Sequence, residues 1–335
     1  MVEVKAENTL LSIVVCLFVA LSNTFSGQFA KEALTLDETK FFAPYWMTYL
    51  NTLLMIPLYP IFLAVKVLFT TAKATDINYD AMKILKNEKG KFYPIPVLIV
   101  ASILIVYGWI APNYIFAVSL KFISVSAAVS INSLNAAMVF VLSILWLKAR
   151  FSWFKACGVV LSIAGVVLVS MDDEFTGSVT GVVLILLCAS CIAIYNTSFK
   201  KIFGDLNLGQ VLFFLTLLGL ANLVFNSFTT YMLVKYDLDV LVWEAIPWKA
   251  VAGNLAMAAL YNISVNMGIA ILNPLVVSIG ILLGIPISAA VDILFHGLDA
   301  GLTVLVGGIL ISIGFCLNTL PIDEWTRKKP VVIVA

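Results

Sequence analysis

The chain has 335 residues, of which 62% are hydrophobic and only 12% are charged. Soluble globular proteins are about half apolar and about a quarter charged, so this composition excludes a soluble enzyme, a disordered protein and a fibrous repeat. The net charge of +1 provides no bulk field that would recruit nucleic acid. The class that remains is a protein folded within a lipid bilayer.

Ten hydrophobic stretches follow one another along the chain. A transmembrane helix needs about 20 apolar residues with few charges, and most gaps between charged residues have this length. The longest uncharged gap, between Lys249 and Asp292, contains the turn signal Asn273-Pro274, which divides it in two. We expect spans at about 8–30, 41–66, 95–119, 123–147 and 152–171, and at about 178–200, 208–234, 249–272, 274–294 and 300–320.

Lys and Arg are distributed unevenly over the connections between these stretches. With the N-terminus in the cytosol, fifteen of them fall on the cytosolic side and five on the outer side. Cytosolic loops of membrane proteins carry the excess of Lys and Arg. We therefore expect both termini in the cytosol. The sequence leaves open whether the membrane is the plasma membrane or an endomembrane such as that of the Golgi.

Two parts of the chain resemble each other at a spacing of about half its length. VSIN at 129–132 recurs as VSIG at 277–280, and GVVLSIAG at 158–165 recurs as GGILISIG at 307–314, with offsets of 148 and 149 residues. A unit of five spans crosses the bilayer an odd number of times, so its second copy is inverted, as in many secondary transporters. The sequence predicts an all-α integral membrane protein in which ten transmembrane helices form two inverted five-helix repeats, residues 1–174 and 175–335.

The segment from SVSAA at 124–128 through LWLKARF at 145–151 to GVVLSIAGVV at 158–167 resembles the signature of the drug/metabolite transporter superfamily, also called EamA-like. In the second half, NISVNMGIA at 262–270 and SIGILLGIP at 278–286 are similar to the F branch of solute carrier family 35, nearest its proposed thiamine transporters. The resemblance covers almost the whole chain. It implies the fold of ten spans in two inverted halves and transport of a solute.

Polar side chains within the apolar stretches are the candidates for a substrate site. Such side chains are costly in lipid unless they face the bundle interior, pair with one another or meet water. Hydrogen bonding between packed helices is the competing interpretation for each of them. The candidate substrate-binding residues are Asn23, Gln28, Asn51, Trp109, Asn113, Tyr114, Asn132, Asn135, Tyr195, Asn222, Asn226, Tyr261, Asn262 and Asn266.

The charge pattern favours one class of solute. No Lys or Arg lies at the centre of an expected span, whereas a carrier of nucleotide sugars needs a cation to hold phosphate away from water. An organic cation such as thiamine can instead lie over aromatic rings. We expect a secondary transporter, not driven by ATP, that moves a small polar organic solute, with thiamine as the candidate, by alternating access through a midplane cavity. The alternatives are an antiporter of nucleotide sugars or other anionic metabolites with the same fold, and a membrane scaffold that transports nothing.

Catalytic groups are scarce. The one histidine, His296, and the one acid within the expected spans, Asp292, both lie near the outer end of the ninth span. They do not form a catalytic set, and no phosphate-binding loop of the Walker type occurs. We expect no enzyme, no metal and no cofactor. The expected partners are a small-molecule solute and the lipid bilayer, with no nucleic acid, and a homodimer is left open.

Overall fold

The computed structural model describes residues 2–37, 39–70, 73–86, 90–119, 122, 131–132, 134–170, 179–272, 274–284, 287 and 302–319. Asp292 and His296 lie outside these residues. The helices are α1 Val2–Thr35, α2 Pro44–Leu53, α3 Leu58–Phe69, α4 Ala74–Ala81, η1 Met82–Leu85, α5 Ile95–Ser119, α7 Leu134–Trp146, α8 Trp153–Ser170, α9 Val179–Phe203, α10 Leu208–Lys235, η2 Trp243–Ala245, α11 Trp248–Ile271, α12 Pro274–Leu282 and α14 Leu302–Thr319.

Long apolar helices dominate the described residues. Six stretches among them are long and apolar enough to cross a membrane, namely Ser12–Leu34, Pro44–Phe69, Ile95–Phe116, Val179–Phe203, Leu208–Lys235 and Trp248–Ile271. Shorter apolar helices cover Leu134–Trp146, Trp153–Leu168 and Val306–Asn318. The fold is that of an all-α membrane protein with several crossings, as the sequence predicts. The count of ten spans in two repeats stays a prediction.

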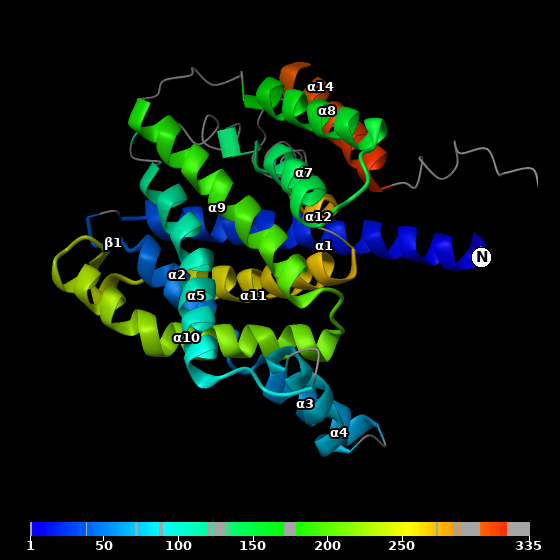
Figure 1. Cartoon of the computed structure of the whole chain (residues 1–335). Helices are drawn as coiled ribbons and strands as arrows, with labels where there is room; N and C mark the ends of the chain where they lie inside the picture. Colours follow the sequence, from blue (N-terminus) through cyan, green and yellow to red (C-terminus); the bar gives the residue numbers. More distant parts are fainter. Residues whose placement is uncertain are drawn as a thin grey trace, which may run out of the picture.

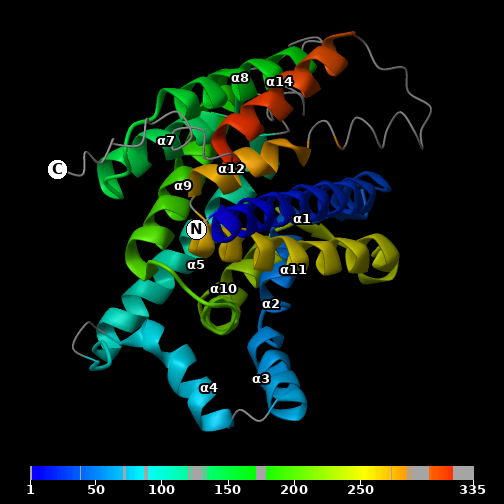
Figure 2. The same cartoon turned by 90° about the vertical axis from the view of Figure 1, so that its right-hand side faces the viewer.

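Segments far apart in the sequence lie side by side. α1 packs along α11, and α5 packs along α9 (Figures 1 and 2). α8 and α14 lie together at one edge of the molecule, and α3 and α4 lie at the opposite edge. Between these edges, α2 and α3 pack against α10, while α7 packs against α9 and α12. The helices of the first and second parts of the chain are therefore interleaved, and each part covers apolar surface of the other.

The second expected span, at about 41–66, consists of two helices instead of one. α2 ends at Leu53 and α3 begins at Leu58, and turns occupy the residues between them. Pro57 and Pro60 have no backbone N–H, and a proline ring also clashes with the carbonyl one turn before it. The break lies in the middle of the apolar stretch Pro44–Phe69, at the depth where unpaired backbone groups are most costly.

Thr216 of α10 supplies additional hydrogen bonds at this break. Its hydroxyl lies 3.2 Å from the carbonyl oxygen of Met55 and 3.0 Å from that of Ile56, and can donate to either. The same hydroxyl accepts the backbone N–H of Tyr59 at 3.1 Å. Gly219, one turn further along α10, permits the close approach, because a Cβ there would lie 2.8 Å from the Ile56 side chain.

A short antiparallel ribbon joins two connections at one end of the molecule. β1 Phe41–Phe42 pairs with β2 Val240–Leu241. Next to β2, the buried carboxylate of Asp239 accepts the backbone N–H of Trp46 at 2.8 Å. Ala43, the residue before α2, provides no side-chain cap. Asp239 therefore caps α2 from a connection almost 200 residues later in the chain, where a carboxylate also meets the positive end of the helix dipole.

α8 and α14 pack through the glycines of the two repeated segments. A Cβ on Gly314 would lie 2.5 Å from the carbonyl oxygen of Gly158, and a Cβ on Gly165 would lie 2.5 Å from that of Gly307. Both distances are too short for any other residue without a backbone shift. Small residues that let helix backbones approach are typical of packing within membranes. The repeated sequence thus forms one continuous helix–helix interface.

Candidate functional site

Two asparagines on α11 form the centre of the candidate site. Asn262 and Asn266 are both almost completely buried and lie one turn apart on the same face. The Asn266 amide donates to the backbone carbonyl of Asn262 at 2.9 Å. Neither side-chain oxygen has a hydrogen-bond partner among the described residues. Two amide acceptors are therefore available inside the helix bundle.

An aromatic pair between α5 and α9 adds a second part of the site. The ring centroids of Trp109 and Tyr195 lie 5.5 Å apart at an interplanar angle of 53°. Gly108, beside Trp109, faces the Tyr195 ring, which a Cβ at this position would meet at an ordinary contact distance of 3.6 Å. The Tyr195 hydroxyl is buried and finds no partner within the part of the chain that the structure describes.

α7 and α12 contribute further polar atoms. The side-chain oxygens of Asn135 on α7, of Ser278 on α12 and of Asn132, two residues before α7, are buried and without a partner in the described ranges. α12 contacts α7, α9 and α11, and α9 contacts α7 and α11. Polar atoms that lack partners thus come from four helices that pack against one another. We call Asn135, Tyr195, Asn262, Asn266 and Ser278 the central polar set.

The structure separates another group of candidates from this set. The Tyr45 hydroxyl donates to Asn226 at 2.5 Å, and Asn226 donates to the side chain of Asn222 at 3.1 Å. Asn222 in turn donates to the backbone carbonyl of Tyr49 at 3.2 Å. Tyr114 stacks edge-to-face on Tyr45, with ring centroids 5.1 Å apart. These side chains join α10 and α5 to α2, which favours helix packing for Asn222 and Asn226.

The remaining candidates are dispersed. Asn113 is exposed and donates to the carbonyl of Trp109 on its own helix at 2.8 Å. Asn51 on α2 is half-buried, with a side-chain oxygen that no described residue pairs with. Asn23 and Gln28 are half-buried on α1, and Tyr261 packs partly buried beside the core around α10.

Sequence reasoning missed polar residues that the fold uses. Asn254 lies on the same face of α11 as Asn262, two turns earlier, and donates to the backbone carbonyl and hydroxyl of Ser26 on α1 at 2.9 and 3.0 Å. Asn254 precedes Asn262 by eight residues, and this helical spacing could have identified it from the sequence. Thr216 and Asp239 offered none, because their partners are backbone groups on distant segments.

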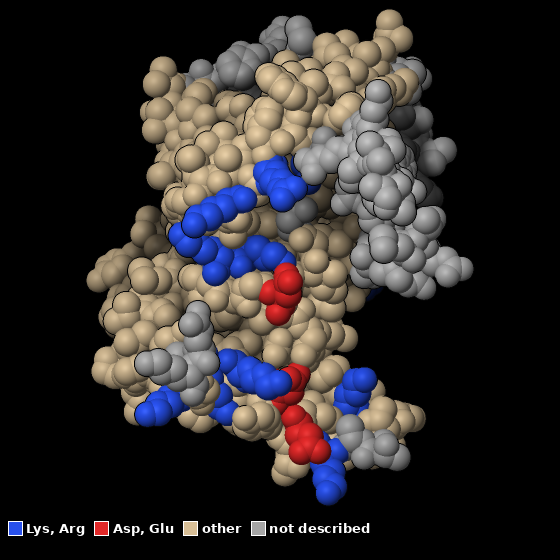
Figure 3. Space-filling view, turned by 45° about the vertical axis from the view of Figure 1, so that its right-hand side comes forward, with Lys and Arg blue, Asp and Glu red and all other residues tan. Residues whose placement is uncertain are grey.

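Charged side chains lie at the ends of the six long helices. Figure 3 shows Lys and Arg in two groups on the end of the molecule where α1 begins, with few acids among them. Lys200, in the last turn of α9, pairs with Asp205 at 2.5 Å and donates to the Ala270 carbonyl at the end of α11. No group of three His, Cys, Asp or Glu side chains that could hold a metal ion occurs among the described residues.

The arrangement of several long apolar helices with buried polar side chains between them defines a multi-pass membrane protein. Residues 10–171 match the model of the EamA-like transporter family. A solved crystal structure superposes with a TM-score of 0.67 at 13% sequence identity, over 94% of this chain and 99% of that chain, which shows that the fold is shared.

Curated relatives narrow the family. The chain is 32% identical over 314 residues to solute carrier family 35 member F4 of Mus musculus and of Homo sapiens, covering 92% of this chain and 64% and 59% of those proteins. It is 30% identical over 226 residues to human solute carrier family 35 member F3. The chain spans about three-fifths of the length of the F4 proteins. These matches confirm the resemblance of its motifs to the drug/metabolite transporter superfamily and to the F branch of solute carrier family 35.

Proposed function

We propose that the protein is a secondary carrier that moves a small polar organic solute across its membrane by alternating access. Its ten spans form two inverted halves, residues 1–174 and 175–335, with both termini in the cytosol. The solute binds to the central polar set near the midplane between the halves.

The helix pairing supports two halves. If the expected spans are numbered along the chain, α1–α11 pairs the first with the eighth, and α5–α9 pairs the third with the sixth. When the two halves are exchanged, the first span takes the place of the sixth and the eighth takes the place of the third, so the first pairing becomes the second. α2–α10, α7–α12 and α8–α14 pair the second, fourth and fifth spans with their own counterparts. This is the pattern that a two-fold relation between the halves requires.

The observation that carries the proposal is the burial of polar atoms without partners. Asn262 and Asn266 are 3% and 1% exposed, and their side-chain oxygens lack partners among the described residues. A buried acceptor without a hydrogen bond costs about 1–3 kcal/mol. A solute that offers N–H or O–H donors recovers this free energy when it binds, so the cost of the empty site becomes affinity for the solute.

The charge pattern and an aromatic pair support an organic cation as the substrate class. No Lys or Arg lies in the middle of the six long helices that the structure describes. The Trp109–Tyr195 pair offers aromatic faces, and a cation–π contact contributes about 0.5–2 kcal/mol. An organic cation with an aminopyrimidine edge, such as thiamine, matches rings and amide oxygens together.

One observation favours the second candidate, an antiporter of nucleotide sugars or related anions. Lys200 is largely buried, with 14% of its side chain exposed, at the junction of α9 and α11. An anionic solute that enters from this end would meet the ammonium group. Asp205 and the Ala270 carbonyl already hold that group, so we rank this candidate second.

Uptake by proteoliposomes tests the proposal. We expect saturable uptake of labelled thiamine by the wild type and a loss of about tenfold or more in the Tyr195→Phe/Asn262→Ala double variant, since each lost hydrogen bond costs about 1 kcal/mol. Ser312→Ala, which removes an exposed hydroxyl bonded within α14, is the matched control and should retain uptake. Uptake of a nucleotide sugar in place of thiamine would favour the second candidate. Thiamine uptake that survives the double variant would move the site elsewhere.

A further inference from the structure

The connection between α3 and α5 is folded into a small module. It contains α4, η1 and an antiparallel bridge between Lys86 and Phe92. The Tyr93 N–H donates to the Leu85 carbonyl at 3.0 Å and closes the base of the loop. We call residues 73–86 and 90–94 the α4 module. Its backbone hydrogen bonds give it a defined shape at the ends of two long apolar helices.

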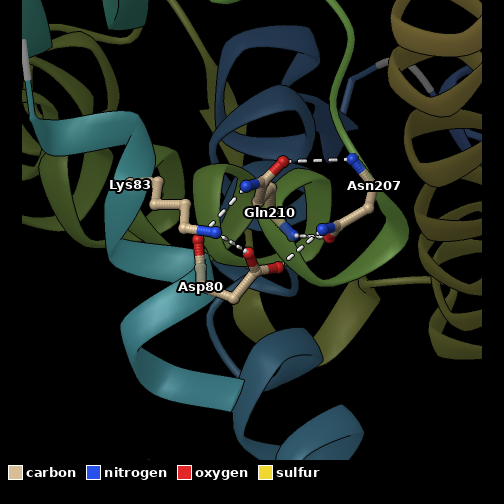
Figure 4. Close-up of polar contacts among 4 residues, drawn as sticks. All are labelled: Asp80, Lys83, Asn207 and Gln210. Atoms are coloured by element: carbon tan, nitrogen blue, oxygen red, sulfur yellow. Dashed lines mark hydrogen bonds and ion pairs between the residues drawn. The ribbon is translucent and has the colours of Figure 1, made fainter. Parts of the chain in front are cut away.

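Asp80 fixes the α4 module to the start of α10. Its carboxylate accepts from the Asn207 amide at 2.6 Å and from the Lys83 ammonium at 2.7 Å (Figure 4). Gln210 donates to the Asp80 backbone carbonyl at 3.1 Å and also completes the capping box of α10 with Asn207. The position of the module is therefore set by α10, and one of its sides remains uncovered.

The uncovered side carries large apolar residues next to the helix ends. Phe69, the last residue of α3, is 82% exposed, and Ile95, the first residue of α5, is 72% exposed. Tyr79 and Phe92 on the module are 62% and 55% exposed. Exposed aromatic rings at the ends of membrane-spanning helices are typical of the lipid headgroup region.

Lysines are interleaved with these rings. The Lys86 ammonium lies 4.1 Å from the centroid of the Tyr79 ring and 4.9 Å from that of the Phe92 ring. Lys66 and Lys73 are exposed at the end of α3 and the start of the module. Between residues 66 and 91 the described chain carries five lysines and two aspartates, of which Asp80 already pairs with Lys83.

We propose that the α4 module is a docking surface for anionic lipid headgroups of the adjoining leaflet. The lysines attract the headgroup charge, each contributing about a fivefold gain in affinity, and the exposed rings enter the interface beside them. The position at the ends of α3 and α5 places the lysines where headgroups lie. Because Asp80 holds the module against α10, lipid bound here is linked to the start of α10 through this module.

The experiment is a titration of detergent-purified full-length protein with short-chain phosphatidylserine and phosphatidylcholine, followed by native mass spectrometry. We expect a preference for phosphatidylserine that falls at least tenfold in the Lys66→Gln/Lys73→Gln/Lys86→Gln variant. The matched control is Lys235→Gln/Lys249→Gln. It removes two exposed cations, at the end of α10 and the start of α11, on the opposite end of the molecule, and should retain the preference.

Other outcomes overturn the proposal. They are an unchanged preference in the triple variant, an equal loss in the control, or displacement of the lipid by soluble glycerophosphoserine at equal concentration, which would indicate a headgroup pocket instead of a membrane-facing surface. Unfolding temperatures in phosphatidylcholine alone establish that the variants are folded. Loss of solute uptake would not affect this test, since binding is measured without transport.

Discussion

Thr216 lies beside the break between α2 and α3 and pairs with backbone groups there. A threonine hydroxyl both donates and accepts, so one side chain satisfies the Tyr59 N–H and a carbonyl of the break together. Valine has nearly the same shape but neither function.

We expect Thr216→Val to lower the free energy of unfolding by about 1–3 kcal/mol, because it leaves a buried N–H and a buried carbonyl unpaired. Thr216→Ser keeps the hydroxyl and should cost less. Thermal unfolding in nanodiscs compares the two. Equal unfolding temperatures for the valine and serine variants would show that water or another group satisfies the break.

Asp239 performs a comparable task at the start of α2. Replacement of a capping carboxylate by alanine costs about 0.5–2 kcal/mol. We expect Asp239→Ala to lower the unfolding temperature and to speed hydrogen exchange of the first turn of α2, where it caps the Trp46 N–H. Glu244→Ala, an exposed acid on the same connection, is the control and should change neither. Unchanged exchange in Asp239→Ala would exclude the capping role.

At the scale of elements, the α4 module and the α8–α14 pair show two ways of holding helices together, one polar and one by close backbone contact. Hydrogen bonds from Lys83 and Asn207 lower the pKa of the Asp80 carboxyl from its ordinary value. A carboxyl whose pKa is lower in the folded state stabilises that state at pH values above its unfolded pKa of about 3.9. This stabilisation disappears as the pH falls through the lowered pKa.

The contacts of the Asp80 carboxylate with Lys83 and Asn207 should therefore persist at any pH between about 5 and 8. We expect hydrogen exchange of α4, corrected for the intrinsic rate, to be the same at pH 5 and pH 7.5 in the wild type. Asp80→Asn should raise exchange at both values, since it removes the charge that faces Lys83. Asp76→Asn, on the exposed side of the same helix, serves as control. A wild type that loosens at pH 5 would contradict the lowered pKa.

The glycine contacts of α8 and α14 predict opposite effects for one substitution at two positions. A Cβ on Gly314 would lie 2.5 Å from the Gly158 carbonyl oxygen, whereas a Cβ on Gly27 of α1 would meet nothing within 4 Å. We expect Gly314→Ala to destabilise by about 1–3 kcal/mol and Gly27→Ala to be neutral or to stabilise by up to about 1 kcal/mol through helix propensity. Unfolding temperatures measure both, and a tolerated Gly314→Ala would mean that the helices separate easily.

At the scale of the whole molecule, orientation is the property that every transport model needs. Lys201 lies in the last turn of α9, at the end that carries most cations, and Trp243 is exposed on the connection between α10 and α11. We expect a membrane-impermeant maleimide to label a cysteine at 201 once the plasma membrane is permeabilised. We expect it to label a cysteine at 243 in intact cells if the protein lies in the plasma membrane, or only after the organelle membranes are also opened if it lies in an endomembrane. The five native cysteines are first replaced. The reverse labelling pattern would show that the protein has the opposite orientation in its membrane.

Hydropathy and charge predicted the helical membrane fold because a membrane helix must be a long apolar run, a property of contiguous sequence. The break between α2 and α3 was missed although Pro57 and Pro60 are visible, since counting apolar residues takes no account of missing amide hydrogens. Asn222 and Asn226 were assigned to a substrate site, yet they bond to α2 across more than 170 residues. No local pattern distinguishes a polar side chain with a distant partner from one without.

The Thr216 contact also bears on how the chain is made. Met55 and Ile56 precede Thr216 by 161 and 160 residues. At 5–20 residues per second, a ribosome delivers Thr216 about 8–32 s after the break has been synthesised. Until then the Tyr59 N–H and the Ile56 carbonyl lack the partner that Thr216 provides, so the early helices cannot reach their final packing alone. A polypeptide that stops before α10 therefore keeps two backbone groups without this partner in the middle of an apolar stretch.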